Sequence, residues 1–355
     1  MADLLKVLPR IFFPKGDPLQ FIFFITAKCN LRCRHCFYLE NIDEPKDELS
    51  LNEIEKISHG MGDLLWLSLT GGEPFLRKDI AQIAKIFYVN NKFNLLTICT
   101  NGILQDQIIR SVSDICRTCK KGHIIIYVSL DGMKETHDHL RGLQGGFETA
   151  LGTVRELKKL KKDFKNLNVG TITTCSAENQ KDMGRLASFL KSEIKPDNIS
   201  INLIRGKPRS TNLGAVDLKH YFEFVKVQKE GWATGDFGHF NLFGKTFIRR
   251  RELLQKQVIS TVFKEDRYVI PCLAGNISCV MTETGDLYPC EILDKKIGNI
   301  KETDYDFKRL WHSTEAAKLR SFIKDTKCYC TYECAITTNI LFNMSQLTKM
   351  FTGRA

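Results

Sequence analysis

Apolar runs of strand length alternate with amphipathic stretches of helix length through the first 205 residues of the chain. This alternation predicts parallel strands that are connected by helical crossovers. Six such units are too few for the eight of a closed barrel, so an open, partial barrel or a doubly wound sheet follows. The predicted strands are 20–26, 64–70, 95–100, 123–130, 167–174 and 199–204.

The rest of the chain divides into two further parts. Residues 216–263 have a helical pattern with a glycine-containing break at 231–244. From Pro271 to the end, the chain holds six of its thirteen cysteines, few long periodic segments, and turn signals at 284–286 and 298–299. This composition is typical of a small module that is held together by metal. We therefore expect three domains, at 1–215, 216–265 and 266–355.

Neither export nor membrane insertion is expected. The longest apolar stretch near the start, 21–25, is far shorter than the ~20 residues that span a bilayer, and it lacks the flanks of a signal peptide. An odd number of cysteines in such a chain argues against a disulfide framework and favours metal or redox use. We expect a cytoplasmic protein without a membrane span.

The formal net charge of +11 makes an anionic partner plausible. Much of the excess comes from Lys158, Lys159, Lys161 and Lys162, which lie on the polar side of a predicted amphipathic helix, so a solvated helix face explains them better than a binding patch. The chain has neither zinc-finger spacing nor aromatic segments typical of RNA-binding domains, and nucleic acid is not an expected partner.

Three cysteines follow the first predicted strand within one loop. Cys29, Cys33 and Cys36 have the spacing C-x3-C-x2-C, which lets three thiolates converge on a single iron–sulfur cluster. Because a [4Fe–4S] cluster has four irons, three thiolates leave one iron without a protein ligand. By the logic that separates catalytic from structural zinc sites, an open position is a place for a substrate or cofactor to bind.

This loop resembles the signature of the radical S-adenosylmethionine (SAM) enzymes. The resemblance implies a partial (β/α)6 barrel in which the free iron binds the amino and carboxylate groups of SAM and His35 lies by the adenine. After the second strand, the sequence is similar to the family's GGEP turn, which binds the methionine amino group. That turn consists of Gly71, Gly72, Glu73 and Pro74.

Further polar residues that the resemblance assigns to SAM binding follow other predicted strands. They come after the carboxyl ends of the strands, where barrel and open α/β folds place their active sites. Several also have an ordinary explanation, because Asn-Gly and Asp-Gly are common turn pairs and Asn is common at helix starts. These residues are Thr100, Asn101, Ser129, Asp131, Arg141 and Asn179.

The cysteines of the C-terminal module resemble the opening of SPASM and shorter "twitch" extensions, which carry auxiliary [4Fe–4S] clusters. Too few cysteines remain for two clusters, so we expect one auxiliary cluster. Cys328 is the first replacement if one of the preferred ligands is wrong, and the role of Cys279 stays open. A structural zinc site made of the same thiolates is the alternative. The preferred ligands are Cys272, Cys290, Cys330 and Cys334.

The remaining cysteines carry no expected chemistry. Cys116 and Cys119 form a C-x2-C pair, but they lie in a helix-and-turn stretch without a second pair. Ordinary thiols explain them best, and Cys99 and Cys175 are left without an assignment.

The resemblance implies that a one-electron donor such as flavodoxin or ferredoxin reduces the cluster, which then cleaves SAM to methionine and a 5′-deoxyadenosyl radical. This radical removes hydrogen from an unactivated C–H bond. With four cysteines for a closed auxiliary cluster, we expect it to transfer electrons during the oxidation or modification of a small molecule or peptide. Two other readings stay open: a non-enzymatic iron–sulfur electron carrier, and a barrel enzyme with structural zinc.

Three basic residues after the sixth strand, Arg205, Lys207 and Arg209, mildly favour an anionic substrate. A guanidinium suits bidentate binding of carboxylate or phosphate, and Arg205 is expected to face the same cavity as Cys36 and Glu73. A structural salt bridge at the barrel rim is the alternative for Arg205.

Overall fold

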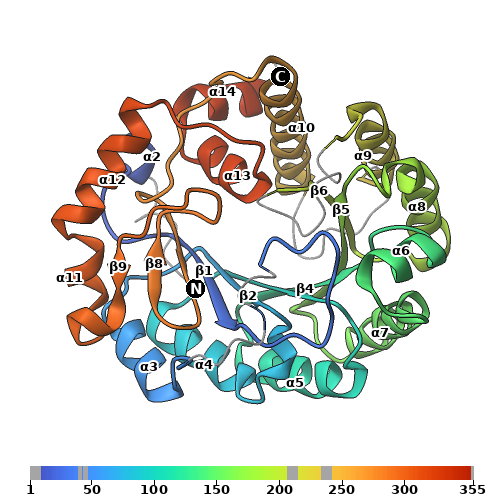
Figure 1. Cartoon of the computed structure of the whole chain (residues 1–355), viewed down its shortest axis with the longest axis horizontal. Coiled ribbons are helices and arrows are strands. Elements are labelled where there is room, and N and C mark those ends of the chain that lie inside the picture. Colours follow the sequence, from blue (N-terminus) through green and yellow to red (C-terminus); the bar gives the residue numbers. More distant parts are fainter. Residues whose placement is uncertain (1–8, 39–41, 43–46, 206–214, 233–241, 353–355) are drawn as a thin grey trace.

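The structure is a computed structural model that describes residues 9–38, 42, 47–205, 215–232 and 242–352. Within these ranges the strands form one sheet, in the order β6-β5-β4-β3-β2-β1-β7-β8-β9. Figure 1 shows the sheet curving through the centre of the molecule, with helices outside it. The strands are β1 (Gln20–Thr26), β2 (Trp66–Gly71), β3 (Leu95–Thr100), β4 (His123–Ser129), β5 (Leu167–Cys175), β6 (Asn198–Leu203), β7 (Ser278–Met281), β8 (Asp286–Tyr288) and β9 (Gly298–Asn299).

The six strands predicted from the alternation of apolar runs are confirmed. They correspond to β1–β6, which pair in parallel as neighbours in chain order, and their ends differ from the predicted ends by at most two residues. The α/β class and the open, partial-barrel arrangement of parallel strands with helical crossovers are therefore as expected.

Helices connect the parallel strands and extend the C-terminal part. Most follow a strand and return the chain to the other end of the sheet, as parallel pairing requires. They are α2 (Pro9–Phe12), α3 (Leu51–His59), α4 (Ile80–Asn91), α5 (Gln105–Thr118), α6 (Lys134–Arg141), α7 (Gly146–Leu160), α8 (Met183–Phe189), α9 (Leu218–Trp232), α10 (Leu242–Glu265), α11 (Phe307–Trp311), α12 (Thr314–Asp325), α13 (Glu333–Leu341) and α14 (Met344–Thr352).

The sheet continues into the cysteine-rich part of the chain. β7 pairs in parallel with β1, and β8 and β9 add two antiparallel strands at that edge. The expected boundary near residue 266 therefore does not interrupt the sheet. Gly298 and Asn299, which the sequence suggests as a turn, form the short strand β9 because their backbone pairs with β8.

β1 is buried on both faces, which fits its central position. On the outer face, Phe21 and Phe23 pack against Phe87 of α4 at ring-centre distances of 5.6 and 6.2 Å. On the inner face, Ile22 and Phe24 pack with Tyr332 and with other apolar residues of the C-terminal part. Strand alternation thus separates an outer helix-covered core from an inner layer that the C-terminal part covers.

Side chains of α10 and α13 bond backbone groups of β6, the last strand at one edge of the sheet. Gln255 of α10 donates to the backbone oxygen of Glu333 at 2.7 Å, and Lys256 donates to Ile201 of β6 at 3.1 Å. The Glu333 carboxylate in turn accepts the Leu203 N–H at 2.8 Å. In the described part of the chain, no helix is both long enough and apolar enough to cross a membrane.

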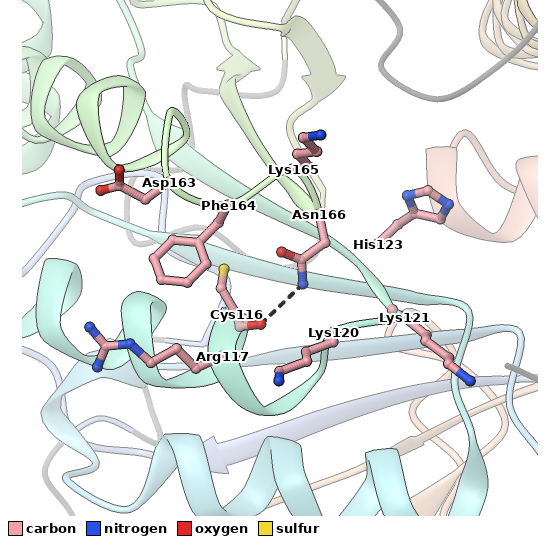
Figure 2. Close-up of a pocket in the computed structure, with 10 residues that line it drawn as sticks. Cys116, Arg117, Lys120, Lys121, His123, Asp163, Phe164, Lys165 and Asn166 are labelled. Atoms are coloured by element: carbon pink, nitrogen blue, oxygen red, sulfur yellow. Dashed lines mark hydrogen bonds between the residues drawn. The ribbon is translucent and has the colours of Figure 1, made fainter.

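A hollow of about 370 Å³ lies at the amino ends of β4 and β5 (Figure 2). Arg117, Lys120, Lys121 and Lys165 contribute to its lining. The cysteines of the first loop follow the carboxyl end of β1, so this hollow lies at the opposite end of the sheet. Cys116 and Cys119 are 1% and 0% exposed, which confirms them as buried thiols.

Candidate active site

The loop after β1 gathers three thiols. Burial, together with the nearby Glu73, Cys33 and Cys36, raises the pKa of Cys29 to about 11. Within the loop, the Cys36 N–H donates to the Cys33 oxygen at 3.2 Å, and the Leu31 N–H donates to Cys29 Sγ at 3.5 Å. The three sulfurs are thus close enough to feel each other's charge, as the donor set of one shared cluster requires.

The glycine turn after β2 packs directly on this loop. Gly71 has a φ of +137°, which side chains rarely adopt. A Cβ at Gly71 would lie 2.2 Å from the Thr26 oxygen, and a Cβ at Gly72 would lie 2.2 Å from the Lys28 oxygen. Only glycine therefore allows the turn to approach the cysteine loop, which explains why these two residues occur at the end of β2.

Glu73 ties the turn to the end of β3. Its carboxylate accepts the Thr100 hydroxyl and the Asn101 N–H, both at 2.8 Å, and it is 1% exposed. Burial raises the pKa of Glu73 to about 7. Asn101 also donates to Asn30 of the cysteine loop at 2.8 Å. Pro74 begins a short 3-10 helix, η2 (Pro74–Leu76), just after the carboxylate.

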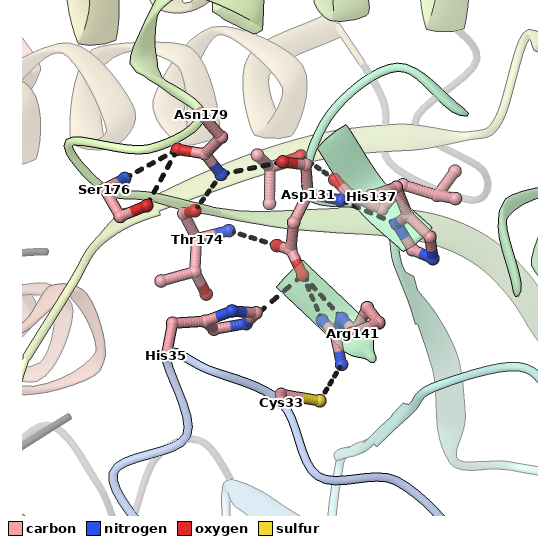
Figure 3. Close-up of polar contacts among 10 residues, drawn as sticks. Cys33, His35, Asp131, His137, Arg141, Thr174, Ser176 and Asn179 are labelled. Carbon is pink, nitrogen blue, oxygen red and sulfur yellow. Dashed lines mark hydrogen bonds and ion pairs between the residues drawn. The ribbon is translucent and has the colours of Figure 1, made fainter. Parts of the chain in front are cut away.

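A charged network joins the cysteine loop to the ends of β4 and β5 (Figure 3). Asp131 accepts from Arg141 Nε at 2.6 Å and lies 3.3 Å from His35 Nε2, while Arg141 Nη1 donates to Cys33 Sγ at 3.7 Å. Burial would raise the pKa of Asp131, but Arg141 and His35 outweigh it and hold this pKa well below its usual range. The Asp131 carboxylate is therefore ionised and holds the Arg141 guanidinium beside the Cys33 sulfur.

Asp131 and Asn179 have partners inside the protein. The Asn179 amide donates to the backbone oxygens of Asp131 and Thr174, both at 2.7 Å, and accepts the Ser176 N–H at 2.7 Å (Figure 3). Asp131 is 0% exposed and Asn179 is 1% exposed. Both side chains are therefore buried and held by partners within the protein.

Two further predicted residues lie at the same edge. Ser129 ends β4 and is paired through the sheet with Ile172. His35 is buried, and its Nδ1 has no hydrogen-bond partner among the described residues. A buried ring nitrogen without a partner beside the cysteine loop fits a site that a further hydrogen-bonding group completes.

The C-terminal cysteines form a second set of thiols with one change from the expected ligands. Cys272 and Cys328 share a hydrogen bond, which raises the pKa of Cys272 and lowers that of Cys328 to about 7. Burial raises the pKa of Cys330, and nearby Cys290 and Cys328 raise it further. Four thiols thus influence one another's protonation: Cys272, Cys290, Cys328 and Cys330.

Cys334, a preferred ligand in the sequence analysis, lies elsewhere. It is in the first turn of α13 and is hydrogen-bonded to Tyr332, and nearby Glu291 and Arg205 influence its pKa. Cys328, and not Cys334, is the thiol hydrogen-bonded to Cys272, while the choice of Cys334 as a ligand stays a prediction. Among the described residues, no three His, Cys, Asp or Glu side chains converge on a point that would hold a single metal ion.

Arg205 is committed to the protein rather than free for an anionic substrate. Its Nη2 pairs with Glu291 Oε2 at 2.8 Å, and its guanidinium lies 4.9 Å from the Phe37 ring centre and 4.4 Å from that of Tyr332. Glu291 also accepts the Tyr332 hydroxyl at 2.7 Å. The salt bridge that the structural alternative expects is present, and its buried carboxylate neutralises the charge of Arg205. Lys207 and Arg209 lie outside the described residues.

Replacing Arg205 with Met is expected to lower the free energy of unfolding by about 3–5 kcal/mol, because it leaves the 5% exposed Glu291 carboxylate without a cation. Anaerobic urea denaturation measures this. Lys318→Met is the matched control: its pair with Glu315 is exposed, so the loss there is under about 1 kcal/mol. The double variant Arg205→Met, Glu291→Gln should recover part of the loss. Equal losses in Arg205→Met and Lys318→Met would contradict the expectation.

Sequence reasoning missed several residues that link the two cysteine sets. Glu291 and Tyr332 connect to Arg205, and Tyr38 donates a hydrogen bond to Glu283 in the C-terminal part. Glu291 directly follows Cys290 and Tyr38 lies two residues after Cys36. Adjacency to a predicted ligand is the signal that could have identified both.

Comparison with known families matches this geometry. The chain matches the model of the radical SAM superfamily over residues 23–190 and that of SPASM, an iron-sulfur cluster-binding domain, over 272–335. The chain belongs to the radical SAM superfamily. Its relatives include heme synthases and a sulfatase-maturating enzyme, and this radical SAM protein is also an enzyme.

Relatives of this radical SAM protein differ in what they make. It is 28% identical over 312 residues to the AdoMet-dependent heme synthase of Methanosarcina barkeri, and this alignment covers 83% of each chain. It is 25% identical to the subtilosin biosynthesis protein AlbA of Bacillus subtilis, over 88% of this chain and 66% of AlbA. The structure of anSMEcpe with bound AdoMet and the Cp18Cys peptide has a TM-score of 0.56 at 17% identity and covers 94% of this chain and 96% of that one. This last match supports the fold.

Proposed function

We propose that this enzyme reductively cleaves SAM at a [4Fe–4S] cluster held by Cys29, Cys33 and Cys36, and uses the radical to remove hydrogen from an unactivated C–H bond. The observation that carries the proposal is the packing of the Gly71–Gly72 backbone on the three-cysteine loop. Glu73 directly follows this turn, which fits the loop only as glycine, and Arg141 donates to Cys33 Sγ of the same loop.

The chain's own residues have distinct roles in this proposal. The Glu73 carboxylate and the backbone of Gly71, Gly72 and Pro74 bind the ammonium group of SAM, and Thr100 and Asn101 hold that carboxylate in place. Ser129 and Arg141 serve the carboxylate or ribose end. Asp131 holds Arg141 and His35 in place, and Asn179 holds the backbone of Asp131. His35 Nδ1 is the free hydrogen-bonding atom for the adenine.

One auxiliary [4Fe–4S] cluster is proposed at Cys272, Cys290, Cys328 and Cys330. The support is that these four thiols influence each other's protonation, whereas Cys334 interacts with Tyr332 instead. Four thiolates close the coordination of a cluster, and a closed cluster exchanges electrons rather than binding substrate. A flavodoxin or ferredoxin in the cytoplasm, where thiols stay reduced, is the proposed electron donor.

The proposed substrate is a small molecule or a peptide. The heme synthase relative, which the chain matches over most of its length, supports a small molecule, and AlbA supports a peptide. Glu291 neutralises Arg205, which is the basic residue after β6 that the structure describes. The proposed substrate is therefore not restricted to anions.

The test of this function is SAM cleavage by the reconstituted enzyme under anaerobic conditions. We expect dithionite to give methionine and 5′-deoxyadenosine in equal amounts, with none in its absence. Cell-extract fractions that separate peptides from small molecules should then show which class increases 5′-deoxyadenosine formation. A reduced, iron-loaded enzyme that binds SAM without cleaving it would contradict the proposal, and zinc in place of the auxiliary iron would favour the structural-zinc alternative.

A further inference from the structure

One group of side chains connects the first cysteine loop to the C-terminal cysteines through direct contacts. One member directly follows Cys36 and another directly follows Cys290, so both ends of the group are chain neighbours of proposed cluster ligands. The proposed function assigns the group no role. We call it the bridge, and its members are Phe37, Arg205, Glu291 and Tyr332.

Arg205 is the centre of the bridge. Its Nη2 donates to Glu291 Oε2 at 2.8 Å, and the Tyr332 hydroxyl donates to the other oxygen of that carboxylate at 2.7 Å. The guanidinium carbon lies 4.9 Å from the Phe37 ring centre and 4.4 Å from the Tyr332 ring centre. A planar guanidinium contacts aromatic rings and pairs with a carboxylate at the same time, whereas an ammonium group offers only a point charge.

The ion pair at the centre of the bridge is buried and therefore costly to separate. The Arg205 side chain is 20% exposed, and the Glu291 side chain is 5% exposed. Tyr332, which bonds the same carboxylate, is 4% exposed. Separating a pair at this depth leaves a buried charge without compensation. A displacement of Glu291 therefore requires a displacement of Arg205.

The two ends of the bridge rest on different strands. Arg205 follows β6, and the N–H of the residue before it donates to the last residue of β5 at 2.9 Å. Phe37 packs on β1, with 6.4 Å between its ring centre and that of Phe24. The apolar group that holds Phe37 there also contacts Cys330. The place of Phe37, and with it the end of the first loop, thus depends on groups that neighbour the C-terminal cysteines.

We propose that Arg205 is a positioning residue that couples the two cysteine sites. When the C-terminal thiols hold iron, the backbone at Cys290 is fixed, and Glu291 keeps Arg205 in place. Arg205 in turn holds Phe37 and the end of the loop whose three thiolates share one cluster. This inference rests on the proposed function and goes beyond it, because it makes the retention of iron by the first loop depend on the occupancy of the second site. Contiguous packed and hydrogen-bonded groups of this kind carry coupling between sites.

The test measures how fast a chelator removes iron from the first loop of the reconstituted enzyme under anaerobic conditions. The electron paramagnetic resonance signal that changes when SAM is added reports the first site alone. The variant is Arg205→Lys, which keeps a cation for Glu291 but loses the planar contact with Phe37. We expect the signal to disappear at least about fivefold faster than in the wild type, which is the lower end of typical couplings between sites.

A double-mutant cycle separates this coupling from local packing. The double variant Cys272→Ala, Cys290→Ala removes the second site, and iron should leave its first loop about as fast as it leaves that of Arg205→Lys. Adding Arg205→Lys to this double variant should accelerate the loss little further, because the connection is already broken. If the double variant does not fold, Cys290→Ser replaces it, with the same expected result.

Tyr38→Phe is the matched control for Arg205→Lys. Tyr38 is the chain neighbour of Phe37, but its hydroxyl bonds Glu283 rather than Glu291. Any effect of this substitution on iron loss should therefore be the same factor with and without the second site.

Equal acceleration by Arg205→Lys with and without the second site would show that Arg205 only packs locally, and this overturns the inference alone. A first loop that keeps its iron at the wild-type rate without the second site does the same. A wild type without any SAM-responsive signal after reconstitution overturns the proposed function and the inference with it.

A second readout does not depend on the signal of the first cluster. Amide hydrogen exchange of residues 33–38 should be faster in Arg205→Lys than in the wild type when both sites are loaded, and this difference should disappear when the second site is removed. Equal exchange in the two loaded proteins contradicts the inference.

Discussion

Replacing Cys29, Cys33 or Cys36 with Ala is expected to abolish SAM cleavage while part of the iron stays bound. The three thiols lie in one loop and influence each other's charge, so losing any one removes a ligand from the same cluster. The second set of thiols lies in the C-terminal part and keeps its own iron. Anaerobic iron analysis together with a 5′-deoxyadenosine assay on each variant measures both effects.

Cys119→Ala is the control for these three variants. Its thiol is 0% exposed, packs near the Ala84 backbone, and lies near the amino end of the sheet. It should keep the iron content and SAM cleavage of the wild type. Turnover that persists in any of the three loop variants would remove that cysteine from the proposed cluster.

Replacing both Cys272 and Cys290 with Ala is expected to lower the iron content by about four atoms per chain, as for one [4Fe–4S] cluster. The change that SAM causes in the electron paramagnetic resonance signal of the first cluster should persist, because that cluster has separate ligands. Iron analysis and spectra with and without SAM measure the two outcomes.

Two single variants decide between the neighbouring cysteines. Cys328→Ala should lose the auxiliary iron, since its thiol bonds Cys272, whereas Cys334→Ala should keep it. The opposite result would return Cys334 to the ligand set. A wild type that never exceeds one cluster of iron would show that the C-terminal thiols hold no cluster.

The sequence by itself determined the features that depend on short spacings. Apolar runs and helical periodicity predicted β1–β6 because strand and helix patterns repeat over a few residues. The loop of Cys29, Cys33 and Cys36 and the turn at Gly71 and Gly72 were recognisable because their ligands and backbone constraints lie within single loops. Domain boundaries were harder, since the pairing of β7 with β1 joins segments more than 250 residues apart.

Only the tertiary structure decided which distant side chains meet. C-x-C-x3-C offers three candidate sulfurs, and only the fold shows that it is Cys328 whose thiol is hydrogen-bonded to Cys272. Arg205 looked free in the sequence because its partner, Glu291, is 86 residues away. A charge is neutralised by whatever the fold brings within hydrogen-bond distance, and sequence patterns carry no record of that distance.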